Sequence, residues 1–395
     1  MYTLQKAQQI ISSNIKRLPG ESVDLKDGLN RIVFSDITAI VPQPPFDESM
    51  RDGYVIPESD EHDKATKRFE IVGEIPAGKT YADRLHPGTA CRIMTGGCVP
   101  RGGVHVVPFE KCAEQNGEMV VAGHLLESAR YIRKKGSEIA LGDRVVQSGV
   151  ALQPMHLALL SSCGVRSVDV STRPSFGFLC TGSELRSLSS ELEKGQKYSS
   201  NSVLLEGLST SFGACPEDLG VIEDNKSDLL DFFLKAKGRG LDFLVTTGGV
   251  GPGKYDLVRD AFVEAGGQVV FTALDMRPGK SVLFGILEGT LFFGLPGPSF
   301  AVQTLFNVLV GPAILAMQGG KGRWPQKVKG CMQHQITTKR CDVLRLKDGV
   351  LTSDRGSCSV RVAARCEISN CYILLQPGEI CYPKGALVDV YLLAG

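Results

Sequence analysis

The spacing of apolar residues changes along the chain and divides it into segments with different expected structures. From residue 173 to residue 317, short apolar runs alternate with segments in which apolar residues recur at helical spacing. The short runs predict strands at residues 175–180, 218–222, 242–247, 268–271, 281–285 and 291–295. The longer segments, which end in glycine, predict helices at residues 201–213, 226–238 and 255–267. This alternation predicts a doubly wound α/β domain.

The segment from residue 46 to residue 137 predicts a small β domain. Strand-like pieces with little helical periodicity, separated by glycine and proline, occur at residues 68–75, 91–96, 105–110 and 118–123. The flanking residues 23–44 and 138–170 are expected to pair into a further unit, because residues 142–165 have the pattern of a strand, a turn and a helix. The small β domain is therefore expected to be an insertion.

After Arg323, Trp324 and Pro325 the pattern changes to short alternating runs with turn signals between them, which predicts a C-terminal β domain. A chain of 395 residues also exceeds what one hydrophobic core usually supports. The sequence thus predicts an α/β multidomain protein. We expect an α/β domain at residues 1–20 and 171–322, a linking domain at 21–44 and 138–170, an inserted β domain at 45–137 and a C-terminal β domain at 323–395.

The charges of the chain are nearly balanced. Lysine and arginine total 44, and aspartate and glutamate total 43, so we expect no nucleic-acid and no membrane partner. The first 18 residues predict an amphipathic helix rather than a signal peptide, and we expect a cytoplasmic protein. Pro296, Gly297 and Pro298 interrupt the uncharged residues 290–318, which favours a buried strand, turn and helix over a membrane span.

Cysteine is frequent in this chain. It has 12 cysteines but no CxxC pair, and free buried thiols are the expected state. A metal cluster in the last segment would require a ligand spacing that the sequence does not show. The cysteines of that segment are Cys331, Cys341, Cys358, Cys366, Cys371 and Cys381.

Three glycine-bearing loops follow predicted strands of the α/β domain. Loops at the carboxyl ends of parallel strands offer unpaired N–H groups to anions, and glycine lets the backbone approach a phosphate closely. The loops therefore predict a phosphorylated ligand, although tight turns in a large sheet would give the same pattern. The candidate binding residues are Thr181, Gly182 and Ser183 in the first loop, Gly248, Gly249, Gly251 and Gly253 in the second, and Pro296 and Gly297 in the third.

Charged residues accompany these loops. Glu184, Asp224 and Asp256 are expected at the same edge of the sheet, where carboxylates and ligand phosphates would hold Mg²⁺. A helix cap at Asp256 and a turn at Asp224 are the alternative interpretations. Arg277 and Lys280 suit a phosphate or a tetrahedral oxyanion, although such a pair is usually a solvated turn.

Two loops of the predicted β domain have the composition of ligand-binding loops. Residues 44–54 place Asp52, Gly53 and Tyr54 at a turn, and residues 92–97 end a strand in Thr95 and two glycines. Exposed loops on a rigid scaffold often contact a ligand. Neither loop identifies the ligand.

Together these segments resemble the molybdopterin molybdenumtransferase family, which includes bacterial MoeA proteins and the gephyrin E domain. The resemblance is collinear over nearly the whole chain. Its landmarks are PPFDESMRDGY, GEIPAGK, RIMTGG, RKKGSEI with GDRVVQSG, RPSFGFLCTGSEL, YSSNSVLL, TTGGVGPGKYD, MRPGKS and GLPG.

The resemblance implies an elongated homodimer of four-domain subunits with a molybdopterin-binding α/β domain. Its site would lie between the α/β domain of one subunit and the inserted β domain of the other. The implied reaction takes adenylylated molybdopterin, a small-molecule pterin, together with molybdate or tungstate. It cleaves the pyrophosphate with Mg²⁺ or another divalent cation and releases AMP and molybdenum cofactor. The adenylyltransferase of the same pathway is a further implied partner.

The resemblance also assigns roles to residues. Glu184, Asp224 and Asp256 would position the metal and the pyrophosphate, and Asp52 and Thr95 would complete the site across the dimer. The implied catalytic residues are Asp52, Thr95, Asp256, Arg277 and Lys280, and Ser299 joins the binding residues of the three loops.

The chain departs from the family pattern on the side of the oxyanion. Gly251 and Ala301 stand where the family usually has serine, the usual GLPGNP is GLPGPS, and Arg277 replaces a lysine. A site retuned toward tungstate, or toward another form of the substrate, would explain these changes. The alternative is a non-catalytic paralogue that acts as a dimeric scaffold or as a pterin-binding protein.

Overall fold

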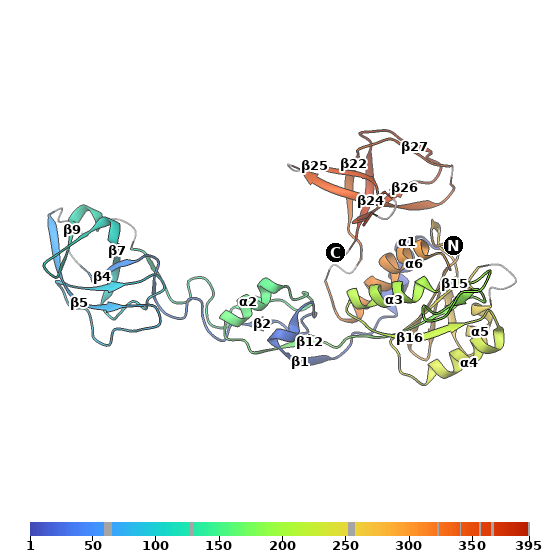
Figure 1. Cartoon of the computed structure of the whole chain (residues 1–395), viewed down its shortest axis with the longest axis horizontal. Helices are drawn as coiled ribbons and strands as arrows, with labels where there is room; N and C mark the ends of the chain where they lie inside the picture. Colours follow the sequence, from blue (N-terminus) through green and yellow to red (C-terminus); the bar gives the residue numbers. More distant parts are fainter. Residues whose placement is uncertain are drawn as a thin grey trace.

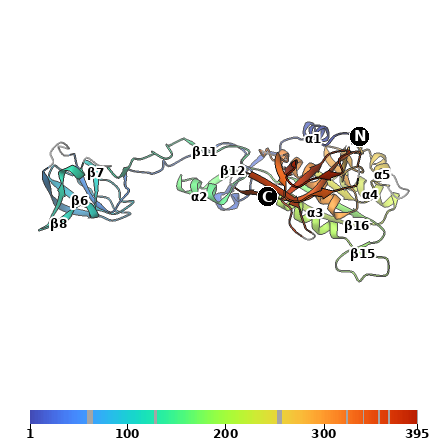
Figure 2. The ribbon, with the colours of Figure 1, turned by 90° about the horizontal axis from the view of Figure 1, so that it is seen from above.

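The computed structural model describes residues 1–58, 65–126, 130–251, 257–321, 324–339, 341–354, 357–364 and 367–393. The molecule is elongated (Figure 1). A β-rich region lies at one end, a narrow region joins it to the rest, and the α/β region lies with the C-terminal strands at the other end, as the second view also shows (Figure 2). The predicted multidomain architecture with an inserted and a C-terminal β domain is confirmed, whereas the residue boundaries of the domains stay a prediction.

The α/β domain is built on a sheet whose strands follow the order β16-β13-β17-β21-β20-β18. Neighbours among β16, β13, β17 and β21 are parallel, β20 is antiparallel to β21, and β18 is antiparallel to β20. The bounds are β13 (Ser175–Thr181), β16 (Cys215–Ile222), β17 (Phe243–Thr247), β18 (Gln268–Phe271), β20 (Leu283–Leu287) and β21 (Thr290–Leu295). Each of the six predicted strands overlaps one of these.

Helices cover both faces of this sheet, which explains why its strands are continuous apolar runs. Alternate residues of a strand point to opposite faces. Phe243 and Phe293 therefore pack in one core with α1, α3, α6 and α7, whereas Leu244 and Phe292 pack in a second core with α4 and α5. The helices are α1 (Leu4–Ser13), α3 (Ser200–Ser211), α4 (Lys226–Lys237), α5 (Val258–Glu264), α6 (Ser299–Leu305) and α7 (Gly311–Met317).

The uncharged segment after β21 forms a buried helix. Helix α6, the π-helical turn Phe306–Val310 and α7 are continuous. In the described part of the chain, Ser299–Met317 is the one helix long and apolar enough to cross a membrane, but 78% of its apolar window is buried inside the protein. The expected buried strand, turn and helix is confirmed.

The linking region consists of paired outgoing and returning segments. β1 (Gly20–Asp24) is antiparallel to β12 (Ser167–Ser171), and β2 (Ile37–Thr38) is antiparallel to β11 (Arg144–Val146). β3 (Glu48–Ser49) pairs with β10 (Ile132–Arg133) where the inserted region begins. Helix α2 (Pro154–Ser162) and the 3₁₀ turn Leu25–Gly28 pack on the first two pairs.

The inserted region is a six-stranded sheet in the order β7-β4-β6-β5-β9-β8. Its buried side chains, among them Ile56, Phe69 and Met119 on one face and Val55 and Ile93 on the other, form two small cores. The strands are β4 (Gly53–Pro57), β5 (Thr66–Ile75), β6 (Thr89–Ile93), β7 (Gly103–Pro108), β8 (Ala113–Gln115) and β9 (Glu118–Ala122), with 3₁₀ turns at Phe109–Lys111 and Gly123–Leu125.

The C-terminal strands close into a barrel-like sheet that docks on the α/β domain. The order is β19-β24-β25-β22-β28-β26, and β24 also pairs with β26. Leu346 and Tyr372 share the first core of the α/β domain, and Asn307 of the π-helical turn donates a hydrogen bond to the Tyr372 hydroxyl at 3.0 Å. The strands are β19 (Met276–Arg277), β22 (Lys327–Met332), β24 (Leu344–Asp354), β25 (Ser357–Val362), β26 (Cys371–Leu375) and β28 (Leu387–Leu392), with β23 (Ile336–Thr337) paired to β27 (Cys381–Tyr382).

All described cysteines are free thiols, as expected, but not all are buried. Cys215 and Cys381 are exposed, and burial raises the pKa of Cys91 and of Cys371 to about 11. Cys366 lies outside the described residues. Among the described residues no group of three or more His, Cys, Asp or Glu side chains could hold a metal ion.

We predict that Phe292→Ala lowers the free energy of unfolding of the α/β domain by about 3–5 kcal/mol, as is typical when a buried phenylalanine leaves a cavity. The Phe292 ring stacks on Phe262 at 4.4 Å and meets Phe233 edge to face at 5.3 Å. Urea denaturation followed by circular dichroism measures the change. The half-exposed Val263 on α5 supplies the control, because Val263→Ala leaves no cavity. Equal effects of the two substitutions would contradict the prediction.

Candidate functional site

The carboxyl ends of β13, β17 and β21 bring the three predicted loops together. In the sheet register Cys180 lies opposite Thr247, and Thr247 lies opposite Leu295. The Gly248 N–H donates to the Leu295 carbonyl at 2.9 Å. Gly248 has a φ of +96°, and a Cβ at this position would collide with the backbone oxygen of Thr181. Only glycine therefore permits this approach of the first two loops.

Two of the three predicted carboxylates lie against the first loop. The Thr181 hydroxyl donates to Asp224 Oδ1 at 2.7 Å, and the Asp224 N–H donates to Ser183 Oγ at 3.4 Å. The Glu184 carboxylate folds back over Gly182, where a Cβ would stand 2.8 Å from Oε2. One or two carboxylates plus ligand phosphates are the usual protein ligands of Mg²⁺, so this pair fits such an ion. Asp256 and Gly253 lie outside the described residues.

A cavity of about 400 Å³ opens between these loops and the start of α3, and we name it the polar cavity. It contains four residues expected from the sequence, namely Thr181, Glu184, Gly297 and Ser299. The other residues of its wall were not among the expected site residues, although the motif YSSNSVLL covers residues 198–201 of this wall and Thr247 belongs to the motif TTGGVGPGKYD. They are Leu185, Lys197, Tyr198, Ser199, Ser200, Asn201, Thr247 and Pro298.

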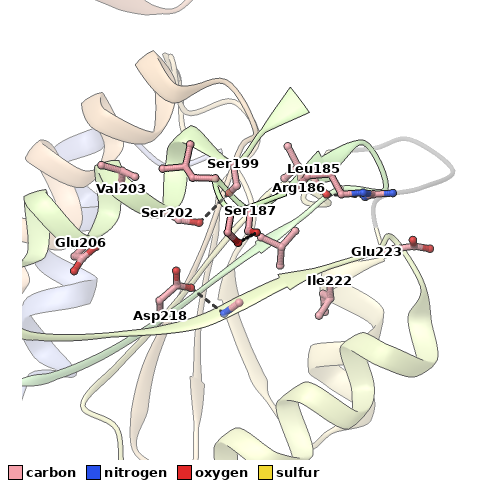
Figure 3. Close-up of a pocket in the computed structure, with 15 residues that line it drawn as sticks. Leu185, Arg186, Ser187, Ser199, Ser202, Val203, Glu206, Asp218, Ile222 and Glu223 are labelled. Atoms are coloured by element: carbon pink, nitrogen blue, oxygen red, sulfur yellow. Dashed lines mark hydrogen bonds between the residues drawn. The ribbon is translucent and has the colours of Figure 1, made fainter. Parts of the chain in front are cut away.

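A second cavity, of about 630 Å³, lies between α3 and the edge strand β16, beneath the segment that follows Glu184 (Figure 3). Figure 3 shows Ser202 of α3 and Asp218 of β16 on opposite walls. Gly182 is the one predicted site residue in its wall. The second cavity therefore contacts the first loop, but neither Glu184 nor Asp224 lies in its wall.

A third cavity, of about 630 Å³, lies where the α/β domain meets the C-terminal sheet, and we name it the cationic cavity. Arg277 and Lys280, both expected from the sequence, line it with Arg345 and Lys347 of β24. β19 pairs with β24 so that Arg277 lies opposite Arg345. Like charges placed opposite each other in a sheet are destabilising, so this arrangement favours a bound anion.

Several residues of the third loop also line the cationic cavity. Pro296, Phe300 and Ala301 form part of its wall. The Asp348 carboxyl shares the cavity, and desolvation raises its pKa above the ordinary value. Gly251 does not line this cavity but shares an adjoining one of about 610 Å³ with Lys280.

Asp52 immediately precedes β4, and Thr95 follows β6, so both belong to the inserted region. This region and the α/β domain lie at opposite ends of the molecule (Figure 1). One chain therefore does not bring them to the three loops. The Thr95 N–H and the Thr95 hydroxyl both donate to Asp52 Oδ1 at 2.7 Å. These bonds hold the pKa of Asp52 below its ordinary value, with the backbone N–H as the largest cause.

We predict that Thr95→Val raises the pKa of Asp52, because the hydroxyl donor is lost while the backbone donor remains. The bonds favour the ionised form. Their contribution to stability is present above the ordinary pKa of aspartate and is lost as the pH falls through the lowered pKa. An NMR titration of the Asp52 carboxyl measures the shift, and Thr95→Ser is the control because it keeps the hydroxyl. An unchanged pKa in Thr95→Val would contradict this account.

The chain is similar to known proteins over most of its length. Residues 2–164 match the MoeA N-terminal region (domain I and II), and residues 177–316 match a probable molybdopterin binding domain. The molybdopterin molybdenumtransferase of Haemophilus influenzae is 32% identical over 325 residues, which cover 81% of this chain and 79% of that protein. That of Staphylococcus epidermidis is 28% identical over 399 residues, covering 97% and 95% of the two chains.

A solved structure is similar over its full length. The molybdopterin biosynthesis MoeA protein of Pyrococcus horikoshii is 26% identical, covers 100% of both chains and superposes with a TM-score of 0.81. The resemblance found in the sequence motifs is thereby confirmed. The chain belongs to the molybdopterin molybdenumtransferase family.

Proposed function

We propose that this protein is a molybdopterin molybdenumtransferase, which inserts molybdate or tungstate into adenylylated molybdopterin and releases AMP in molybdenum cofactor biosynthesis. The observation that carries the proposal is that one loop, residues 296–301, forms part of two cavities of different chemistry. The polar cavity adjoins the acidic pair Glu184 and Asp224, and the cationic cavity holds four basic side chains. A reaction that cleaves the pyrophosphate of an organic substrate and transfers a metal oxyanion to the dithiolene of that substrate needs both kinds of site.

The acidic pair serves the phosphate side of the reaction. Thr181 holds Asp224 through its hydroxyl, and Glu184 lies over the Gly182 turn, so both carboxylates face the edge where the loops meet. We assign Mg²⁺ or another divalent cation to this pair, together with Asp256 of the second loop. When bound, the ion supplies charge neutralisation on the phosphate oxygens.

The basic residues serve the oxyanion side. Arg277, Arg345 and Lys280 offer charge-assisted hydrogen bonds to a tetrahedral dianion. Cleavage needs no nucleophilic side chain, because an oxygen of water or of the oxyanion attacks a phosphorus atom. The bridging P–O bond then breaks, and AMP separates from the pterin phosphate. We infer that the four basic side chains of the cationic cavity compensate for the serine hydroxyls that the family pattern usually has at the positions of Gly251 and Ala301.

A second subunit completes the proposed site. Two loops of the inserted region are held together by the hydrogen bonds between Asp52 and Thr95. The inserted region lies far from the α/β domain of the same chain (Figure 1). We infer a homodimer in which these two loops meet the phosphate side of the partner's α/β domain. A cytoplasmic location and transfer of substrate from the adenylyltransferase of the same pathway complete the proposal.

We predict that the purified protein releases AMP from adenylylated molybdopterin when Mg²⁺ and molybdate or tungstate are present. Glu184→Gln and Asp224→Asn should each slow AMP release at least about 100-fold, more than the loss of a supporting residue around a metal usually costs. Chromatography of the nucleotide products measures the rate. Asp231→Asn, on the exposed side of α4, is the control. A wild-type protein that binds the substrate without releasing AMP would instead be a pterin-binding or scaffold paralogue.

We predict opposite effects of two substitutions in the cationic cavity. Arg345→Ala should weaken molybdate binding, and Asp348→Asn should strengthen it, each roughly fivefold, because one unit charge at 4 Å contributes about 1 kcal/mol in water. In the wild type, binding should strengthen as the pH falls through the raised pKa of Asp348, since the carboxyl becomes neutral. Asp348→Asn should lose this part of the pH dependence.

Equilibrium dialysis against molybdate at several pH values makes this measurement. Lys339→Ala is the matched control, because Lys339 is an exposed cation of the C-terminal region that does not line the cavity. If Arg345→Ala and Lys339→Ala bind molybdate equally well, the oxyanion does not occupy the cationic cavity.

A further inference from the structure

We propose that Asn201 is a positioning residue that binds a hydrogen-bond donor of the organic substrate and, through the same amide, holds the loop shared with the oxyanion cavity. This inference rests on the proposed function. It assigns the organic substrate to the polar cavity and the oxyanion to the cationic cavity, and it names the side chain that couples them.

The orientation of the Asn201 amide is set by its contact with the third loop. Asn201 is the second residue of α3 and is 7% exposed. Its Nδ2 group donates to the Gly297 carbonyl at 2.8 Å. A reversed amide would place two acceptor oxygens against each other, so Oδ1 is the free end. Asn201 Oδ1 has no hydrogen-bond partner among the described residues.

A second buried polar atom of the same cavity also lacks a partner. Thr247, at the end of β17, is 1% exposed, and its Oγ1 forms no hydrogen bond within the described part of the chain. Buried polar atoms are nearly always hydrogen-bonded, because an unmade bond costs free energy. Asn201 and Thr247 both line the polar cavity. Two unmatched groups in one cavity indicate a ligand that supplies the missing bonds.

The chemistry of these groups selects the ligand. An amide oxygen only accepts hydrogen bonds, so its partner must carry an N–H or an O–H. A molybdate or tungstate dianion has no such donor, whereas the pterin, the adenine and the ribose of adenylylated molybdopterin all have one. Glu184, which also lines this cavity, is a further acceptor when ionised. Lys197 of the same wall suits a phosphate of the same substrate.

The loop that Asn201 holds separates the two cavities. Gly297, Pro298 and Ser299 line the polar cavity. Their neighbours Pro296, Phe300 and Ala301 line the cationic cavity. Ser200 provides a second tie from α3 to this loop, since its hydroxyl lies 3.1 Å from the Ser299 hydroxyl.

A substrate that binds Asn201 therefore also orders the wall of the oxyanion site. We expect adenylylated molybdopterin to lower the dissociation constant of molybdate at least about fivefold, and molybdate to have the reciprocal effect. The coupling passes through the Asn201 amide and the Ser200–Ser299 hydroxyl pair.

The experiment measures binding of adenylylated molybdopterin and of molybdate, each alone and with the other, to the full-length protein in EDTA. Asn201→Ala should weaken adenylylated molybdopterin binding about tenfold, leave the binding of molybdate alone within twofold of wild type, and abolish the coupling. Ser200→Ala should reduce the coupling, measured as the ratio of the molybdate dissociation constants without and with adenylylated molybdopterin. Thr210→Ala, on the exposed part of α3, is the control.

Equal binding and equal coupling in wild type and Asn201→Ala would overturn the inference. If Asn201→Ala does not fold, Ser200→Ala decides, because unchanged coupling in that variant overturns the shared-loop mechanism. The outcomes also distinguish a failure of the proposed function from a failure of this inference. A wild-type protein that does not bind adenylylated molybdopterin contradicts the proposed function, whereas an active wild type with an indifferent Asn201→Ala contradicts only this inference.

Discussion

The contact between the backbones at the carboxyl ends of β13 and β17 determines where the glycine loops, the acidic pair and the polar cavity lie. Gly248 bonds to the end of β21 and has no Cβ to collide with the backbone oxygen of Thr181. This contact draws three loops to one edge, and the Thr181 hydroxyl then places Asp224 beside them. A side chain at Gly248 would separate the loops and, with them, the acidic pair and the polar cavity. The chemistry therefore depends on a packing constraint.

The cationic cavity depends on a different constraint, the docking of the C-terminal sheet. Arg277 belongs to the α/β segment of the chain, yet its strand pairs with β24 and faces Arg345. Burial of Leu346 and Tyr372 in the core of the α/β domain provides the apolar contact that offsets the repulsion of the two cations. Gly251 and Ala301, where the family pattern usually has serine, lie near the same basic cluster. This part of the protein therefore has fewer hydroxyls than the family pattern, but four basic side chains line the cationic cavity.

The sequence predicted features that depend on local pattern. Runs such as residues 242–247 are apolar throughout because helices cover both faces of the sheet. The glycine loops could be recognised from their own composition and from their position directly after these strands. The sequence did not predict a role for Arg345, Lys347 or Asn201. Arg345 reaches the site only through the register of β19 with β24, and Asn201 matters because of one bond to Gly297, far away in sequence. The roles of Asp256 and Gly253 stay predictions.

The paired segments of the linking region restrict how the protein can change in length. The chain passes through this region twice, and β1 with β12, β2 with β11 and β3 with β10 keep the outgoing and returning segments in register. A one-residue insertion in one segment alone would shift the register of its pairing with the other segment. The side chains of the shifted strand would then point to the opposite face. The distance between Asp52 and the α/β domain can thus change only through matched insertions or deletions in both segments. The distance between the inserted region and the α/β domain therefore depends on the lengths of two separate segments of the sequence, which must change together.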